Sequence, residues 1–129
     1  MNPPCPNCED ILQRVSISSE RKMHVIQRHY SSECVQDRPT STYNIHPCFF
    51  FEEVVDRLRS GVLEGATHRR RLIYFCEFNF IVGHFPHRGR LRGTNFVKVV
   101  CTKSCCRKHR RPRLLPAKVV TMYPANYPR

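Results

Sequence analysis

Two histidines and an arginine lie close together in the segment HVIQRH, residues 24–29. Histidine titrates near neutral pH, so a pair of imidazoles can supply both proton transfers of RNA transesterification. One ring accepts the proton of the 2′-OH, and the other protonates the departing 5′-oxygen. A neighbouring guanidinium can stabilise the extra negative charge on the phosphorane. His24 and His29 are therefore candidate acid/base groups, with Arg28 as a candidate phosphate contact.

The spacing of the two histidines sets a condition on that chemistry. His24 and Arg28 are four residues apart and share one face of a helix. His24 and His29 are five apart and point about 140° away from each other around the helix axis. The imidazoles converge only if the helix ends near Arg28, or if the substrate lies across its end. The alternative is an amphipathic helix with two surface histidines.

A second pair of polar side chains lies in VVTMYP, residues 119–124. Thr121 and Tyr123 are two residues apart, which places them on one face of a strand, where their hydroxyls can hold a scissile phosphate or position a base. Val120 and Met122 are then expected to face the core. The alternative is an ordinary β-strand, in which Thr and Tyr are common.

The charge of the chain indicates a polyanionic partner. The 22 Lys and Arg outnumber the 10 Asp and Glu, which gives a formal net charge of +12. Such a surface attracts RNA, DNA or anionic membrane, because each neutralised phosphate releases counterions. Basic side chains gather at three places beside the predicted strands, where a nucleic-acid backbone can run along them; a solvated face is the alternative. The candidate RNA contacts are Arg69 and Arg70; Arg88, Arg90 and Arg92; and Lys108, Arg110 and Arg111.

Eight cysteines raise the question of metal or disulfides. Cys5 and Cys8 form a C-x-x-C pair, which is half of a tetrahedral zinc site. A second C-x-x-C is missing, and the adjacent Cys105 and Cys106 are a poorer partner for it. The sequence therefore predicts reduced, free thiols and no cofactor, with these four cysteines as the zinc candidates.

The histidine segment requires a helix to position it. Residues 18–30 predict one, capped by Ser18 or the serine after it. Met23, Ile26 and Tyr30 follow helical spacing and are expected to form its buried stripe.

A second helix is predicted over residues 50–59, where apolar side chains recur at helical spacing and Gly61 can end the helix. Residues 31–47 between the two helices are rich in Ser, Thr, Pro and Asp and predict a loop. Residues 1–17 predict an irregular Cys- and Pro-rich segment.

The rest of the chain predicts strands. Long strands are expected over residues 72–82, 95–101 and 118–123, which are dense in β-branched and aromatic residues. Residues 83–93 and 103–113 are expected to be basic loops between them. Helices followed by strands indicate an α+β fold, with N-terminal helices packed on a twisted antiparallel meander.

The length of 129 residues fits one domain, which we expect over residues 18–124, followed by a loose tail over 125–129. No apolar stretch approaches the roughly 18 residues that span a bilayer. The polar N-terminus predicts no secretory signal, and hence a cytoplasmic protein, or a nuclear one in a eukaryotic or viral setting.

The order of these segments resembles the barnase–EndoU–colicin–RelE group of ribonuclease toxins. It looks closest to the toxin domains of bacterial contact-dependent and polymorphic systems. The matching segments are HVIQRH (24–29), IVGHF (81–85), FVKVVCT (96–102) and KVVTMYP (118–124).

The resemblance implies N-terminal helices on a twisted antiparallel sheet with a concave RNA-binding face. It implies metal-independent cleavage, often of tRNA, that leaves a 2′,3′-cyclic phosphate, and a protein inhibitor that neutralises the enzyme. Carried over by position, His24 and His29 are the acid/base pair with unassigned roles, Arg28 is a phosphate contact, and Thr121 and Tyr123 complete the site.

Two features depart from that group, namely the number of cysteines and the strongly basic segment over residues 103–113. They leave a second hypothesis open, a non-enzymatic basic nucleic-acid-binding protein, stabilised by zinc, of viral or eukaryotic origin. A third hypothesis is a protein-interaction module whose charge serves localisation.

Overall fold

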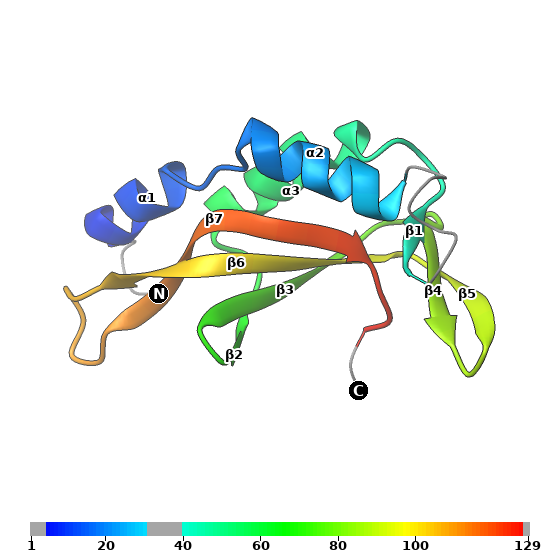
Figure 1. Ribbon diagram of the computed structural model, residues 1–129. Helices are drawn as coiled ribbons and strands as arrows, with labels where there is room; N and C mark the ends of the chain where they lie inside the picture. The colour runs from blue at the N-terminus through cyan, green and yellow to red at the C-terminus, as the bar shows by residue number, and fades with distance from the viewer. Residues whose placement is uncertain (1–4, 31–39, 128–129) are drawn as a thin grey trace.

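The computed structural model in Figure 1 describes residues 5–30 and 40–127, and over these residues it forms three helices and two antiparallel sheets. The helices lie together on one face of the larger sheet, and the smaller sheet lies at one end of the molecule (Figure 1). The predicted α+β class is confirmed. None of the helices in the described part of the chain is long and apolar enough to cross a membrane.

The helix that carries the histidine segment is α2, Ser19–His29. It starts where predicted, because the Oγ of Ser18 accepts a hydrogen bond from the backbone N–H of Arg21 at 3.2 Å. Its last residue is His29, so the segment of interest forms the final turn of the helix.

The buried side of α2 differs from the predicted stripe. Val25 and His29 are buried and Ile26 packs against the core, whereas Met23 and Tyr30 are exposed. Helical spacing alone is compatible with both the predicted stripe and the observed one. It cannot distinguish a stripe of large apolar side chains from a stripe that includes a histidine. The buried position of His29 is therefore a finding of the structure.

The main helix of the core is α3, Cys48–Ser60, which covers the helix predicted over 50–59. Phe51, Val54 and Leu58 lie on its buried face, as their spacing predicts. Gly61 ends it in the left-handed region at φ 72°, a conformation that glycine adopts without a steric penalty.

Both ends of the chain are more ordered than the sequence indicated. Within the segment 1–17, predicted to be irregular, residues Pro6–Gln13 form helix α1. The tail predicted to be loose also packs on the sheet: the N–H of Ala125 donates to the carbonyl of Phe96, and the ring of Tyr127 lies 5.0 Å from the ring of Phe96. Residues 1–4 and 128–129, and residues 31–39 of the predicted loop, lie outside the described residues.

The larger sheet has the strand order β2-β3-β6-β7. Its strands are β2 (Ala66–His68), β3 (Arg71–Glu77), β6 (Phe96–Cys106) and β7 (Arg113–Pro124). The strand predicted over 72–82 ends early, at Glu77, and the backbone N–H of Phe78 still bonds the carbonyl of Asn95 opposite it.

The smaller sheet has the order β1-β4-β5 and consists of β1 (Thr42–Tyr43), β4 (Gly83–His87) and β5 (Arg90–Thr94). The basic loop predicted over 83–93 is therefore a β-hairpin. Its turn residues, Arg88 and Gly89, have φ angles of 50° and 77°. Two positive φ angles suit the tight turn whose twist matches that of the flanking strands.

Strands β6 and β7 form a hairpin that is longer than predicted. Pairing runs from Val97 with Pro124 to Cys106 with Arg113, so both ends of the segment 103–113 are strand and the loop is confined to residues 107–112. The register shifts beside Cys101, and this irregularity places Val119 in the core in place of the predicted Val120.

Alternation along the strands separates a covered face from an open face. Val99 and Met122 are cross-strand partners in the core beneath the helices, as Met122 was predicted to be. Lys98 pairs with Tyr123, and Val100 pairs with Thr121, on the opposite face. We name the half-buried side chains of that opposite face the open face: Ile73, Phe75, Phe96, Lys98, Val100, Thr121 and Tyr123.

Gly83 is expected to tolerate no side chain, because a Cβ there would collide with the backbone oxygen of Thr42 and with Pro124. Overpacking of this kind typically costs about 1–3 kcal/mol. We expect Gly83→Ala to lower the free energy of unfolding by about 2 kcal/mol, measured by urea denaturation. Gly93→Ala is the matched control, since its Cβ would meet only ordinary contacts from 3.4 Å. Equal stability of the two variants would contradict the packing at Gly83.

Candidate active site

A cavity of about 430 Å³ lies at the C-terminal end of α2, where that helix meets β7 and β4. All five residues proposed from the sequence as acid/base, phosphate-contact or hydroxyl groups line it. The lining residues are His24, Arg28, His29, Thr40, Ser41, Pro86, Thr121 and Tyr123. The structure thus brings together two segments that lie about 95 residues apart in the chain.

The end of α2 meets the geometric condition on the histidine pair. The helix stops at His29, and Tyr30 leaves it with φ −134° after its N–H bonds the carbonyl of Ile26. The cavity lies across this last turn, so His24 and His29 both line it despite their angular separation. A substrate in the cavity can therefore lie against both imidazoles.

His29 is held in one protonation form by its neighbours. Its Nδ1 lies 2.8 Å from the carbonyl oxygen of Ser41. Because a carbonyl only accepts, Nδ1 carries the proton, and Nε2 is the unprotonated nitrogen of the neutral ring. The ring also stacks on Tyr123, with centroids 5.0 Å apart and planes 20° apart. The main chain at Ser41 and the last strand together fix the orientation of the imidazole.

The surroundings of His29 favour its neutral form. Burial lowers its pKa below the ordinary value of 6.5, and the charges of Arg28 and His24 lower it further. The hydrogen bond to Ser41 acts in the opposite direction but does not outweigh burial. An imidazole that is neutral at pH 7 is the form a general base requires.

Two hydroxyls of cavity-lining residues have no hydrogen-bond partner within the described parts of the chain. They are the buried Oγ1 atoms of Thr40 and Thr121. A buried hydroxyl without a partner costs about 1–3 kcal/mol. Small side-chain rotations toward the cavity would let an oxygen acceptor, such as a phosphate, pair with them.

The charges around the cavity have one sign. Arg28 lies in its wall, and the Nζ of Lys98 lies 5.7 Å from the centroid of the Tyr123 ring. No carboxylate occurs among the described side chains that line the cavity. The site is therefore electrostatically suited to an anion.

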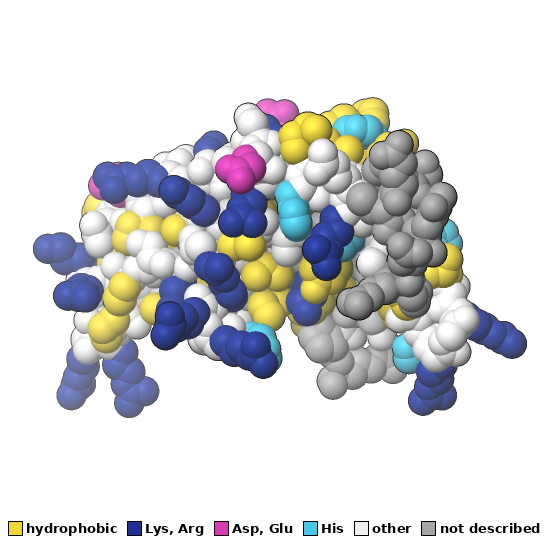
Figure 2. Space-filling model, viewed as in Figure 1, with side chains coloured by type: hydrophobic (Ala, Val, Ile, Leu, Met, Phe, Trp, Pro, Cys, Tyr) yellow, Lys and Arg dark blue, Asp and Glu magenta, His cyan; other side chains and the backbone are white. Residues whose placement is uncertain are grey.

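The other predicted RNA contacts lie outside the cavity, in three hairpins. Arg69 and Arg70 form the β2–β3 turn, and their counterparts lie in the β4–β5 hairpin and the β6–β7 loop. Figure 2 shows Lys and Arg side chains projecting from both ends of the molecule. None of these eight residues lines the cavity: Arg69, Arg70, Arg88, Arg90, Arg92, Lys108, Arg110 and Arg111.

Sequence reasoning missed Thr40, Ser41 and Pro86, which complete the cavity wall. Ser41 acts through its backbone carbonyl, for which the sequence carries no signal. Pro86 lies in a hairpin that had been expected to be a loop. Proximity of these residues to α2 is a consequence of the tertiary fold alone.

The zinc candidates are only partly brought together. Cys5, Cys8 and Cys106 converge, and they are joined by His109 from the basic segment over residues 103–113. Cys105 is exposed and lies outside the group, because neighbouring residues of a strand point to opposite faces.

No protein-family model, curated protein or solved structure matches this chain. The resemblance to the ribonuclease toxins therefore stays a prediction from its motifs, and the geometry of the cavity stands beside it as a separate observation.

The buried neutral His29 makes the stability of the fold depend on pH. Its folded pKa is lowered, so the unfolded chain binds the proton more readily, and stability is lost as pH falls below about 6.5. We expect His29→Gln to weaken this acid sensitivity, measured as the change of the unfolding midpoint between pH 7.5 and pH 5. The exposed His68 provides the control, and His68→Gln should retain the pH dependence of the parent. Identical profiles for all three proteins would contradict a buried neutral His29.

Proposed function

We propose that this protein is a metal-independent endoribonuclease that cleaves RNA by transesterification and leaves a 2′,3′-cyclic phosphate. The observation that carries the proposal is the meeting of His24, Arg28 and His29 with Thr121 and Tyr123 around one cationic cavity. This set supplies two proton-transfer groups, a guanidinium and two hydroxyls without any carboxylate, which is what attack by a ribose 2′-OH requires.

His29 is the general base of the proposed reaction. Its Nδ1 proton is committed to the carbonyl of Ser41, so Nε2 is left to accept the proton of the 2′-OH. The lowered pKa keeps this nitrogen unprotonated at neutral pH. The 2′-oxygen then attacks the adjacent phosphorus and forms the cyclic phosphate.

His24 is the general acid, which protonates the 5′-oxygen as the P–O5′ bond breaks. It lies one turn before Arg28 on the same helix face, so the guanidinium and the acid approach the phosphate from one side. Arg28 stabilises the dianionic phosphorane, and the hydroxyls of Thr121 and Tyr123 position its oxygens. Both proton transfers together balance the reaction.

The open face extends the site for single-stranded RNA. Tyr127 packs against Phe75 and Phe96, with ring centroids 5.4 Å and 5.0 Å apart, so aromatic surface adjoins the positions of Lys98 and Tyr123. Unpaired bases stack on such aromatic rings, while a lysine neutralises the backbone. We therefore favour single-stranded segments as substrate, and tRNA loops through the resemblance.

Two further expectations belong to this proposal. Reduced thiols fit a cytoplasmic or nuclear protein, and the cysteines of the described residues form no disulfide. The resemblance adds a neutralising inhibitor protein, which would have to cover the cavity.

The second candidate function is binding of nucleic acid without turnover. It is favoured by the arginines of the three hairpins, which lie outside the cavity and need no catalytic group to act. Binding through them would be strongly salt-dependent and indifferent to the histidines.

Cleavage is tested with a short RNA and a matched RNA that carries one 2′-deoxyribose at the cleaved position. We expect the parent protein to cut the first RNA and to leave the second intact. Cleavage should be the same with Mg²⁺, without Mg²⁺ and during a brief incubation with EDTA. We expect His24→Ala and His29→Ala each to lower the rate by about 10²- to 10⁴-fold, while His68→Ala stays at the parental rate. Products are read on a denaturing gel and by mass for the cyclic phosphate.

Several outcomes would decide against the enzyme. Intact RNA with the folded parent protein would favour the binding function. Cleavage of the deoxy-substituted RNA would exclude the 2′-OH as nucleophile. If both histidine variants cleaved RNA at the parental rate, the cavity would be excluded as the site of cleavage.

Substitution of the arginines outside the cavity should lower the affinity for RNA without changing the rate of cleavage. Replacing Arg88, Arg90 and Arg92 together with Ser is expected to weaken RNA binding and to reduce the dependence of log K on log [salt] by about two to three units. The single-turnover rate at saturating protein should stay near the parental value, because none of the three lines the cavity. An unchanged salt slope would show that this hairpin does not meet the RNA.

A further inference from the structure

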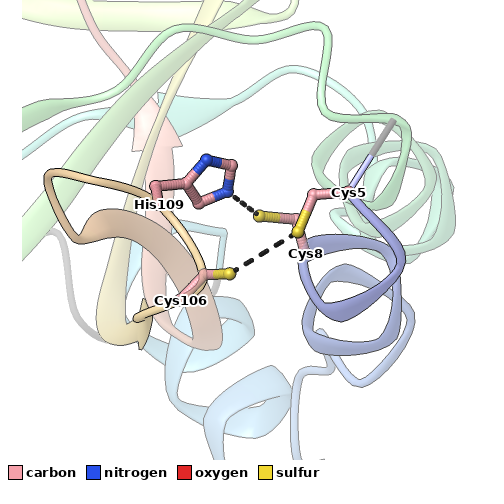
Figure 3. Close-up of side chains that lie close together, drawn as sticks. All are labelled: Cys5, Cys8, Cys106 and His109. Carbon is pink, nitrogen blue, oxygen red and sulfur yellow. Dashed lines mark hydrogen bonds between the residues drawn. The ribbon is translucent and has the colours of Figure 1, made fainter. Parts of the chain in front are cut away.

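Four side chains with metal-binding atoms meet at the end of the molecule where the β6–β7 hairpin turns (Figures 1 and 3). Cys5 and Cys8 come from the start of α1, Cys106 ends β6, and His109 lies in the following loop. Their three sulfurs and one imidazole nitrogen all lie within 4.8 Å of one another. Segments about 100 residues apart in the chain thus contribute one compact set of ligands.

We propose that this cluster is a structural zinc site that fastens helix α1 to the β6–β7 hairpin. The three thiolates and one imidazole are the donor set that zinc prefers over Mg²⁺ or Ca²⁺, which take oxygen ligands. The proposal concerns the fold and is independent of the ribonuclease function.

The distances fit tetrahedral coordination. Zn–S bonds of about 2.3 Å and Zn–N bonds of about 2.0 Å place neighbouring ligand atoms about 3.5–3.8 Å apart. The Sγ atoms of Cys5 and Cys106 are 3.8 Å apart, and the Sγ of Cys8 lies 3.1 Å from the Nε2 of His109. Small side-chain rotations suffice to close all four atoms around one ion, as their inward orientation in Figure 3 indicates.

The spacing along the chain supports the same set. Cys5 and Cys8 are three residues apart, and so are Cys106 and His109. The C-x-x-C pair and the C-x-x-H pair can each supply two of the four ligands of a zinc ion. The four ligands fill the tetrahedron, so no position is left for water or substrate, which makes the site structural and not catalytic.

Hydrogen-bond donors surround one of the ligands, Cys106. The Nδ2 of Asn7 donates to the Sγ of Cys106 at 3.1 Å, and the backbone N–H of Lys108 donates to the same sulfur. Such outer hydrogen bonds orient and stabilise metal ligands. Three thiolates and Zn²⁺ leave one net negative charge, which suits the basic loop over residues 107–112.

Helix α1 is short and packs against the rest of the protein through few side chains, so a metal link would stabilise its position. Two of the ligands, Cys8 and Cys106, belong to a small satellite core, to which Leu12 of α1 and Leu115 of β7 also contribute. The helix has eight residues, and its N-cap makes no side-chain hydrogen bond. Short helices are marginal without tertiary support, so the metal would supply the missing stabilisation and fix the basic loop at the same time.

The first test is the metal content of the purified protein after expression with zinc in the medium. We expect about one zinc per chain, lost in large part in Cys106→Ser and His109→Ala. Cys105→Ser is the matched control, because Cys105 adjoins Cys106 but lies outside the cluster, and it should keep its zinc. Absence of zinc from the parent, or equal loss in Cys105→Ser, would overturn the proposal.

A second measurement uses the parent protein and a variant that keeps all four ligands. Co²⁺ alone added to the zinc-free parent should give the visible absorption of a tetrahedral thiolate site, and Asn7→Ala should bind the ion about tenfold more weakly. In the zinc form Cys5, Cys8 and Cys106 should resist alkylation, while the exposed Cys48 and Cys105 react. An octahedral cobalt spectrum, or equal reactivity of all five thiols, would refute the site.

Discussion

The antiparallel pairing of β6 with β7 is the interaction on which the rest of the structure depends. At the end where Val97 pairs with Pro124, the hairpin places Thr121 and Tyr123 beside the end of α2. At the end where the hairpin turns, it places Cys106 and the following loop beside α1. The same ladder carries Val99 and Met122 into the core. A slip of one residue would turn every β7 side chain to the opposite face and dismantle core and cavity together. The register is held by that buried row.

The position of β7 at the edge of its sheet explains how a helix from the covered side meets residues of the open face. An interior strand would be flanked on both sides, and its open-face side chains would be out of reach of α2. At the edge, His29 in the last turn of α2 stacks on Tyr123, and its imidazole is tied to Ser41 from the chain before β1. Three elements distant in sequence therefore hold one ring, which gives the pre-organisation that a general base needs.

The sequence predicted the parts whose physical signal is local. Helical spacing and a serine cap predicted α2, apolar repetition and Gly61 predicted α3, and two-residue alternation predicted that Thr121 and Tyr123 share a face. It failed where long-range contacts decide. The insertion of the β4–β5 hairpin into a second sheet, the extension of β6 and β7 into the basic segment, and the helix in residues 6–13 all depend on partners far along the chain. His109 was overlooked for the same reason, because a C-x-x-H pair becomes a ligand pair only when α1 is docked opposite it.

Charge connects the stability of this fold to the nucleic-acid partner of the proposed function. With a net charge of +12 and a single ion pair between Arg57 and Glu53 among the described residues, the folded chain repels itself. Exposed pairs add little in any case, so the core and the proposed metal link must hold the fold against that repulsion. A polyanion that neutralises the basic side chains would relieve this repulsion. Under the proposed function, a nucleic acid that binds the folded chain in preference to the unfolded chain would therefore stabilise the fold by mass action.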